Sequence, residues 1–105
     1  VTLSYRVKNI SHQPQKLVLW GQTGGYSYIY DDQGNQYLFN YNGATLNLGS
    51  DSYTSGVQAD IPGDVFVNGS IVIKNVDENA TEFSNITLRA GTTGNNLVFK
   101  NVQIR

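Results

Sequence analysis

Apolar side chains in this chain recur at every second residue in short runs, and turn-forming residues separate the runs. Leu3, Tyr5 and Val7 alternate with polar residues over 2–8, which is the pattern of a strand with one buried face. Elsewhere Gly, Asn, Asp or Ser interrupts nearly every window before apolar residues recur at the spacing of a helix. Only 77–82 is compatible with one helical turn. This periodicity restricts the chain to β structure.

The clearest local signal is a hairpin between residues 26 and 39. Two runs, 26–30 (YSYIY) and 36–39 (QYLF), flank the turn sequence DDQGN. An Asp side chain can cap such a turn, and Gly34 can adopt the positive φ that a loop of this length requires. We therefore predict two antiparallel strands joined at Gly34.

Turn residues mark the remaining strands. Further strands are expected at 17–20, 57–61, 65–73, 86–88 and 97–104, and 40–56 reads as a loop that holds one short strand. Such a succession of about seven to nine short strands, with no helix for crossovers, predicts an all-β antiparallel sandwich of immunoglobulin type. The length of 105 residues fits a single domain over 1–105.

Two of these strands contain irregular positions. Asn68-Gly69 lies inside 65–73 and predicts a bulge or bend. In the last strand Leu97 and Phe99 share one face, whereas Val102 and Ile104 have the other parity. A bulge near Lys100-Asn101 would restore a common inward face for these four side chains.

The composition excludes several function classes. The chain has no Cys, so disulfides, thiolate-bound zinc and Cys nucleophiles are excluded. Its net charge is −1 with no basic segment, which argues against nucleic-acid binding. Polarity comes instead from Asn, Gln, Gly, Ser and Thr, which suits an extracellular, cell-surface or periplasmic protein. No run approaches the ~18 apolar residues of a membrane span. We expect a domain trimmed from a longer secreted or anchored protein.

The order of these features resembles a known kind of domain. An opening strand that ends Val7-Lys8-Asn9-Ile10-Ser11, the turn Asp32-Gln33-Gly34-Asn35, a turn at Pro62-Gly63, the strand 71–76 and the closing Phe99-Lys100-Asn101-Val102 are similar to the immunoglobulin-like domains of small bacterial lipoproteins and secreted antigens. The resemblance spans most of the chain, and it implies fold and compartment. Those families are not known as enzymes, and they define no catalytic residues.

The residues offer little for catalysis or metal binding. His12 is the single imidazole and lies in a turn before Pro14, where no third group would hold it as the base of a Ser/His/Asp triad. The adjacent carboxylates Asp31 and Asp32 would face opposite sides of a strand, which does not suit glycoside hydrolysis. A calcium site is the alternative, formed by Asp31, Asp32 and Asn35 or by Asp60 and Asp64. Neither set has the spacing of the twelve-residue calcium loop. We expect structural turns, no enzyme activity, no metal and no cofactor.

Tyrosine is the remaining candidate for function. Tyr26, Tyr28 and Tyr30 point to one face of a strand and Ile29 to the other, so a buried Ile29 would leave three rings outside. With Tyr37 they form the predicted ligand-binding set, and Trp20 is expected in the core. Such a face fits a protein or glycan at the cell surface. The alternatives are a carbohydrate-binding module, a solvated tyrosine ladder and a structural spacer domain.

Overall fold

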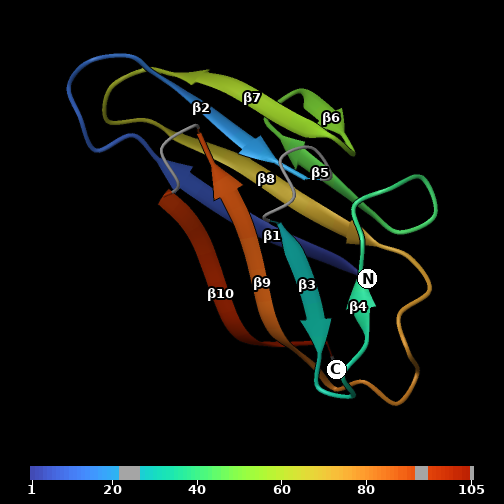
Figure 1. Cartoon of the computed structure of the whole chain (residues 1–105). Coiled ribbons are helices and arrows are strands. Elements are labelled where there is room, and N and C mark those ends of the chain that lie inside the picture. Colours follow the sequence, from blue (N-terminus) through green and yellow to red (C-terminus); the bar gives the residue numbers. More distant parts are fainter. Residues whose placement is uncertain (22–26, 92–94, 105) are drawn as a thin grey trace.

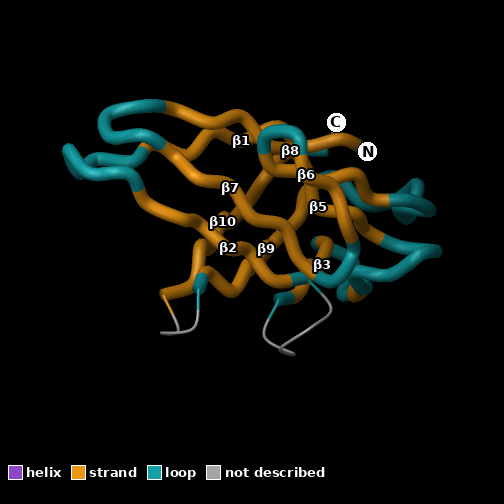
Figure 2. Tube along the Cα trace, turned by 90° about the horizontal axis from the view of Figure 1, so that it is seen from above, coloured by secondary structure: helices purple, strands orange, loops and turns teal. Residues whose placement is uncertain are grey.

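The computed structural model describes residues 1–21, 27–91 and 95–104, with backbone alone at Asn95. These residues form ten strands and no helix (Figures 1 and 2). The strands are β1 (Thr2–Lys8), β2 (Gln15–Trp20), β3 (Tyr28–Asp31), β4 (Gln36–Tyr37), β5 (Ala44–Leu48), β6 (Asp51–Tyr53), β7 (Gly56–Ile61), β8 (Phe66–Ile73), β9 (Glu82–Ala90) and β10 (Asn95–Gln103). All pairings are antiparallel, which confirms the predicted all-β sandwich.

The strands are divided between two sheets. One has four strands in the order β1-β8-β5-β6, and the other has six, in the order β4-β3-β9-β2-β7 with β10 on β9. Strand β9 organises the larger sheet, because β10 pairs along one of its edges while β3 and β2 share the other edge (Figure 1). Ser27 joins these two strands to β9: its hydroxyl donates to the Trp20 carbonyl oxygen and accepts the Arg89 amide N–H.

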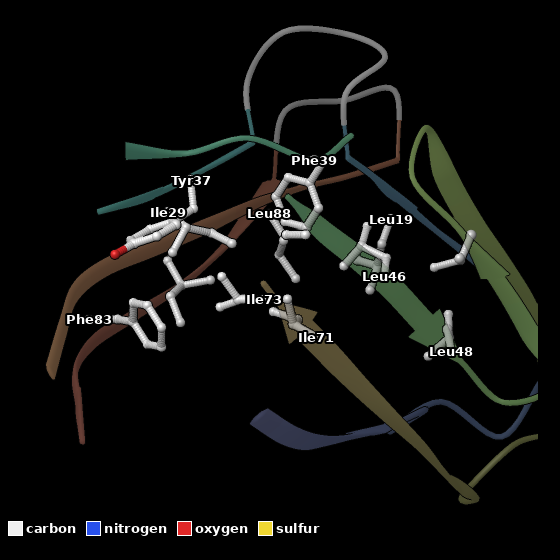
Figure 3. Packing of buried hydrophobic residues seen from close by; sticks show 13 residues of the cluster. Leu19, Ile29, Tyr37, Phe39, Leu46, Leu48, Ile71, Ile73, Phe83 and Leu88 are labelled. Atoms are coloured by element: carbon white, nitrogen blue, oxygen red, sulfur yellow. The ribbon is translucent and has the colours of Figure 1, made fainter. Parts of the chain in front are cut away.

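The core lies between the sheets, as the alternating apolar residues predict (Figure 3). The smaller sheet contributes alternate residues of β5 and β8, and the larger sheet contributes residues of β2, β3, β4, β7 and β9. The buried cluster comprises Leu19, Ile29, Tyr37, Phe39, Ala44, Leu46, Leu48, Val57, Ile71, Ile73, Phe83, Ile86 and Leu88.

The predicted hairpin is confirmed. Strands β3 and β4 pair through Ile29 with Tyr37 and Tyr30 with Gln36, and Gly34 has a φ of 85°. The Asp31 side chain caps the turn, as expected, and the same carboxylate accepts a hydrogen bond from the Tyr37 hydroxyl.

Replacing Gly34 with Val should lower the free energy of unfolding by more than ~1 kcal/mol, because a β-branched residue is strained at positive φ. A Cβ at Gly34 would have no neighbour within 4 Å, so the effect would come from the backbone alone. Gly34→Asn is the matched control and should cost less, since Asn tolerates this conformation. Urea denaturation measures both variants, and an unchanged midpoint for the Val variant would contradict the prediction.

The expected bulge in the 65–73 strand is wrong. Strand β8 pairs with β1 in unbroken register through Asn68 and Gly69, and its regular pairing with β5 extends as far as Gly69. Gly69 is needed there because the ring of Tyr5, its partner on β1, lies over it in the space that a side chain would fill. The Tyr5 hydroxyl donates to the Asn47 carbonyl oxygen at 2.7 Å, and burial raises the pKa of Tyr5 to about 12.

The parity change in the last strand occurs where it was predicted. Asn101 has a φ of 54° and lies between the pairs Lys100 with Asn85 and Val102 with Phe83. On either side of Asn101 the apolar side chains pack against the core, and these are Leu97, Phe99, Val102 and Ile104. The left-handed backbone conformation of Asn101 therefore lets the apolar side chains on both of its sides face the core.

Two further expectations need correction. Residues 40–56 hold two strands instead of one, and β5 is a buried strand inside the smaller sheet, because Ala44, Leu46 and Leu48 alternate toward the core. Residues 77–82 form no helical turn of their own. Asp77 closes a short turn instead, through its backbone oxygen to the Ala80 amide and its side chain to the Asn79 amide, and β9 begins at Glu82.

Loops gather at the ends of the sandwich. The β1–β2 and β7–β8 connections lie side by side at one end (Figure 2), joined by the Asp64 amide, which donates to the Asn9 carbonyl oxygen. Because the described residues form no helix, they contain no helical membrane span.

Candidate functional site

Two of the four predicted ligand-binding tyrosines lie together on the outer face of the larger sheet. Ile29 is fully buried, and the neighbouring Tyr28 and Tyr30 are 36% and 37% exposed. Their ring centroids are 5.7 Å apart with the planes inclined at 64°. The alternation in the sequence thus places these two rings correctly. Tyr26 lies outside the described residues.

Strand pairing extends this surface across β9 and β10. Tyr28 lies opposite Thr87 on β9, and Thr87 in turn lies opposite Val98 on β10. Tyr30 lies opposite Asn85 on β9, and Asn85 lies opposite Lys100 on β10. Val98 is 50% exposed, whereas Thr87 is 3% exposed, and the Thr87 hydroxyl donates to the Asn85 side-chain oxygen at 2.6 Å. We call the six residues Tyr28, Tyr30, Asn85, Thr87, Val98 and Lys100 the tyrosine face. Sequence reasoning missed the last four because the order of strands in a sheet is not visible in the alternation.

Tyr37 does not join the tyrosine face. It pairs with Ile29, so its ring points into the core, where it meets the ring of Phe83 edge-on at 6.0 Å (Figure 3). Its hydroxyl donates to the Asp31 carboxylate at 2.6 Å and accepts the Asp77 amide at 2.9 Å. Tyr37 therefore holds the hairpin against the segment before β9, and its hydroxyl is engaged on both sides.

Trp20 is not in the core, because Leu19, its neighbour on β2, points inward and the two side chains take opposite faces. The half-buried indole lies over Gly56, its partner on β7, and donates through Nε1 to the Gly91 carbonyl oxygen at 3.1 Å. Trp20 thus lies on the same outer sheet face as Tyr28.

Asp31 has a carboxylate that accepts hydrogen bonds on both oxygens. It is 2% exposed and accepts hydrogen bonds from the amides of Gln33 and Asn35, the Asn35 side chain and the Tyr37 hydroxyl. Burial raises its pKa, but the hydrogen bonds from Tyr37, Asn35 and Gln33 outweigh burial and hold the pKa below the ordinary 3.8. Asp31 is a structural group that fixes the hairpin.

Asp31, Asp32, Asn35 and Asp64, four of the five residues weighed for calcium, have other partners. Asp32 accepts hydrogen bonds from the amide and hydroxyl of Thr81, and Asp31 has four hydrogen-bond donors of its own. Asp64 lies 2.8 Å from His12. No group of three or more His, Cys, Asp or Glu suited to a metal ion occurs within residues 1–21, 27–91 and 95–104.

His12 lies in an exposed turn, with 88% of its side chain exposed. Its Nδ1 is 2.8 Å from Asp64 Oδ2. The neighbouring Ser11 hydroxyl donates to the Gln13 carbonyl oxygen instead of the imidazole. An imidazole and a carboxylate are thus brought together without a bonded nucleophile, so this pair lacks the arrangement of a catalytic triad.

The tyrosine face is therefore the candidate site that both the alternation and the geometry single out. No protein-family model, curated protein or solved structure matches this chain.

Proposed function

We propose that this chain is a non-catalytic binding domain of a secreted or surface protein, and that the tyrosine face docks on a protein partner. One observation carries the proposal: two neighbouring, partly exposed tyrosine rings continue into an exposed valine across three paired strands. Tyrosine is enriched among the residues that contribute most to protein interfaces, where it supplies a large contact area at a low cost in conformational entropy.

The shape and charge of the tyrosine face favour a protein over a glycan. The inclination of 64° between the rings of Tyr28 and Tyr30 gives a sugar chain no common plane on which to stack. Val98 adds apolar area, and Lys100 is the single charged member of the set. Few charges at the centre and aromatic residues among polar ones are typical of protein–protein interfaces.

The resemblance and the composition support the proposed compartment. The two-sheet sandwich agrees with the resemblance to immunoglobulin-like domains of small bacterial lipoproteins and secreted antigens, and the surface has few charges and many amides and hydroxyls. We place the domain outside the cytoplasm, at the cell surface or in the periplasm, with a partner protein in the same compartment and with no nucleic-acid ligand.

A cell-binding experiment tests this function. The fluorescently labelled domain should bind intact cells of the organism that produces it, and the double substitution Tyr28→Ala/Tyr30→Ala should weaken binding by tenfold or more. Each exposed tyrosine that contributes ~1 kcal/mol or more to an interface would account for such a loss. Tyr53→Ala is the matched control, because Tyr53 is 61% exposed on β6 of the other sheet.

Treatment of the cells separates the kinds of partner. Protease digestion of the cell surface should abolish binding, and periodate oxidation of surface glycans should leave it intact. Loss after periodate alone would replace the protein partner with a glycan. Binding that survives the double substitution would overturn the role of the tyrosine face, and no binding to any cell preparation would favour a spacer domain.

A further inference from the structure

A second candidate site lies at the end of the sandwich that carries β4. A cavity of about 460 Å³ opens there between the β3–β4 hairpin, the loop 38–43 and the segment 74–77. Its volume lies within the range of about 300–1,000 Å³ that is typical of small-molecule sites. It shares no residue with the tyrosine face. Five side-chain amides line it, from Asn35, Gln36, Asn40, Asn42 and Asn75.

Four of these amides fall into two groups. Asn35 and Asn40 hold the walls: Asn35 Nδ2 donates to the carboxylates of Asp31 and Asp77, and Asn40 Oδ1 accepts the Asn42 amide N–H. The side chains of Asn42 and Asn75 are exposed and form no hydrogen bond with other described residues. Each therefore offers a donor and an acceptor in one plane, the pattern that binds adjacent hydroxyl groups, which both donate and accept.

Apolar surface lies beside these amides. Leu38 lines the cavity and is 54% exposed. Tyr41 lies in the same loop, between two lining residues, and is 87% exposed. The Lys74 ammonium lies 5.6 Å from the centroid of the Tyr41 ring and 3.5 Å from the Tyr41 carbonyl oxygen. The Tyr41 ring thus lies beside Lys74, a residue that lines the cavity, and an exposed aromatic ring can pack on the C–H face of a sugar ring while nearby amides bind its hydroxyls.

The walls are held in place before any ligand arrives. The Ala44 amide donates to the Leu38 carbonyl oxygen at 2.9 Å, and the Lys74 amide donates to the Gly43 carbonyl oxygen at 3.2 Å. On the other side the Tyr37 hydroxyl ties Asp31 to the Asp77 amide. A site ordered by the fold loses little conformational entropy on binding.

We propose that this cavity binds a neutral, hydroxyl-rich saccharide. An added peptide strand is disfavoured, because the adjoining edge strand β4 has only two residues. An anion is disfavoured as well, since the Asp77 carboxylate borders the cavity and the Lys74 ammonium is placed on Tyr41. Amides, one exposed leucine and one exposed ring remain, and these match an uncharged polyol.

Nuclear magnetic resonance of the isotope-labelled full chain tests the proposal. The probes are the neutral tetrasaccharides of β-linked glucose, α-linked mannose and β-linked N-acetylglucosamine at millimolar concentration. At least one should shift the side-chain amide signals of Asn42 and Asn75 and the backbone signals of 38–43. Tyr41→Ala and Asn42→Ala should each weaken that binding by about tenfold, the equivalent of ~1.4 kcal/mol.

Control variants make the result specific. Tyr53→Ala should leave the shifts unchanged, and so should Tyr28→Ala/Tyr30→Ala, which separates the cavity from the proposed function. Asn75 is kept in all variants, because its φ of 57° would strain an alanine. No shift with any of the three sugars, or shifts that persist in both cavity variants, would overturn the saccharide site while leaving the protein-docking proposal to its own experiment.

Discussion

Replacing Asp31 with Ala is expected to lower the free energy of unfolding by about 3 kcal/mol, since it leaves one buried and three partly buried donors without their acceptor. The carboxylate accepts four hydrogen bonds at 2.6–2.9 Å and is 2% exposed. Its removal would leave the Tyr37 hydroxyl, which still accepts the Asp77 amide, without an acceptor for its own proton, and the backbone amides of Gln33 and Asn35 without this partner. Chemical denaturation followed by fluorescence measures the change.

Asp31→Asn is the matched variant. Its amide oxygen can still cap the turn, but its NH₂ group cannot accept from Tyr37, so we expect a loss of about 1.5 kcal/mol. A cost for the Ala variant no larger than that of an exposed Asp such as Asp60 would contradict the buried network.

The Asp31 network also predicts an acid dependence of stability. Hydrogen bonds hold the pKa of Asp31 below the ordinary 3.8, so the charged carboxylate stabilises the folded state above that pH. The contribution should be lost as the pH falls through the pKa of the folded state. Asp31→Asn should therefore flatten the decline of stability below pH ~4. An equally steep decline in this variant would assign the acid dependence to other carboxylates.

Gly69→Ala should lower the free energy of unfolding by about 3 kcal/mol, through overpacking and the loss of one hydrogen bond. The added Cβ would overlap the ring of Tyr5, with Cε2 only 2.6 Å away. The ring would have to move, breaking its bond to the Asn47 carbonyl oxygen. Exposure of the phenol should also bring its pKa down from about 12 toward 10.0, which ultraviolet titration detects.

A double-mutant cycle isolates the contact between Gly69 and Tyr5. In a Tyr5→Ala background the same Gly69→Ala change should cost less than ~1 kcal/mol, because alanine is tolerated in a strand once the ring is gone. Equal costs in the two backgrounds would show that Gly69 is needed for its backbone and not for the approach of Tyr5.

Local patterns predicted the elements that depend on local chemistry. The β3–β4 hairpin follows from Asp31 and Gly34, whose side-chain cap and positive φ act within one turn. The parity change at Asn101 was visible because apolar residues on both sides had to share one core. In contrast, Gly69 was misread as a bulge, because its reason is a side chain 64 positions earlier in the chain.

Local patterns likewise predicted only part of the candidate site. Tyr28 and Tyr30 were found from alternation around Ile29, which is a property of one strand. Tyr37 was misplaced beside them, because its pairing with Ile29 turns it inward. Val98 and Lys100 were missed, since only the position of β9 between β3 and β10 brings them across from the tyrosines.

The sequence by itself determined that this chain is a β-sandwich with two tyrosines outside it, because period-two alternation and turn residues act over a few positions. Only the tertiary structure decided which strands are neighbours and therefore which distant residues share a surface. The amide-lined cavity also exists only because distant segments pack together, since its walls come from 35–43 and 74–77. Those contacts form when two sheets pack, and no spacing along the chain encodes them in advance.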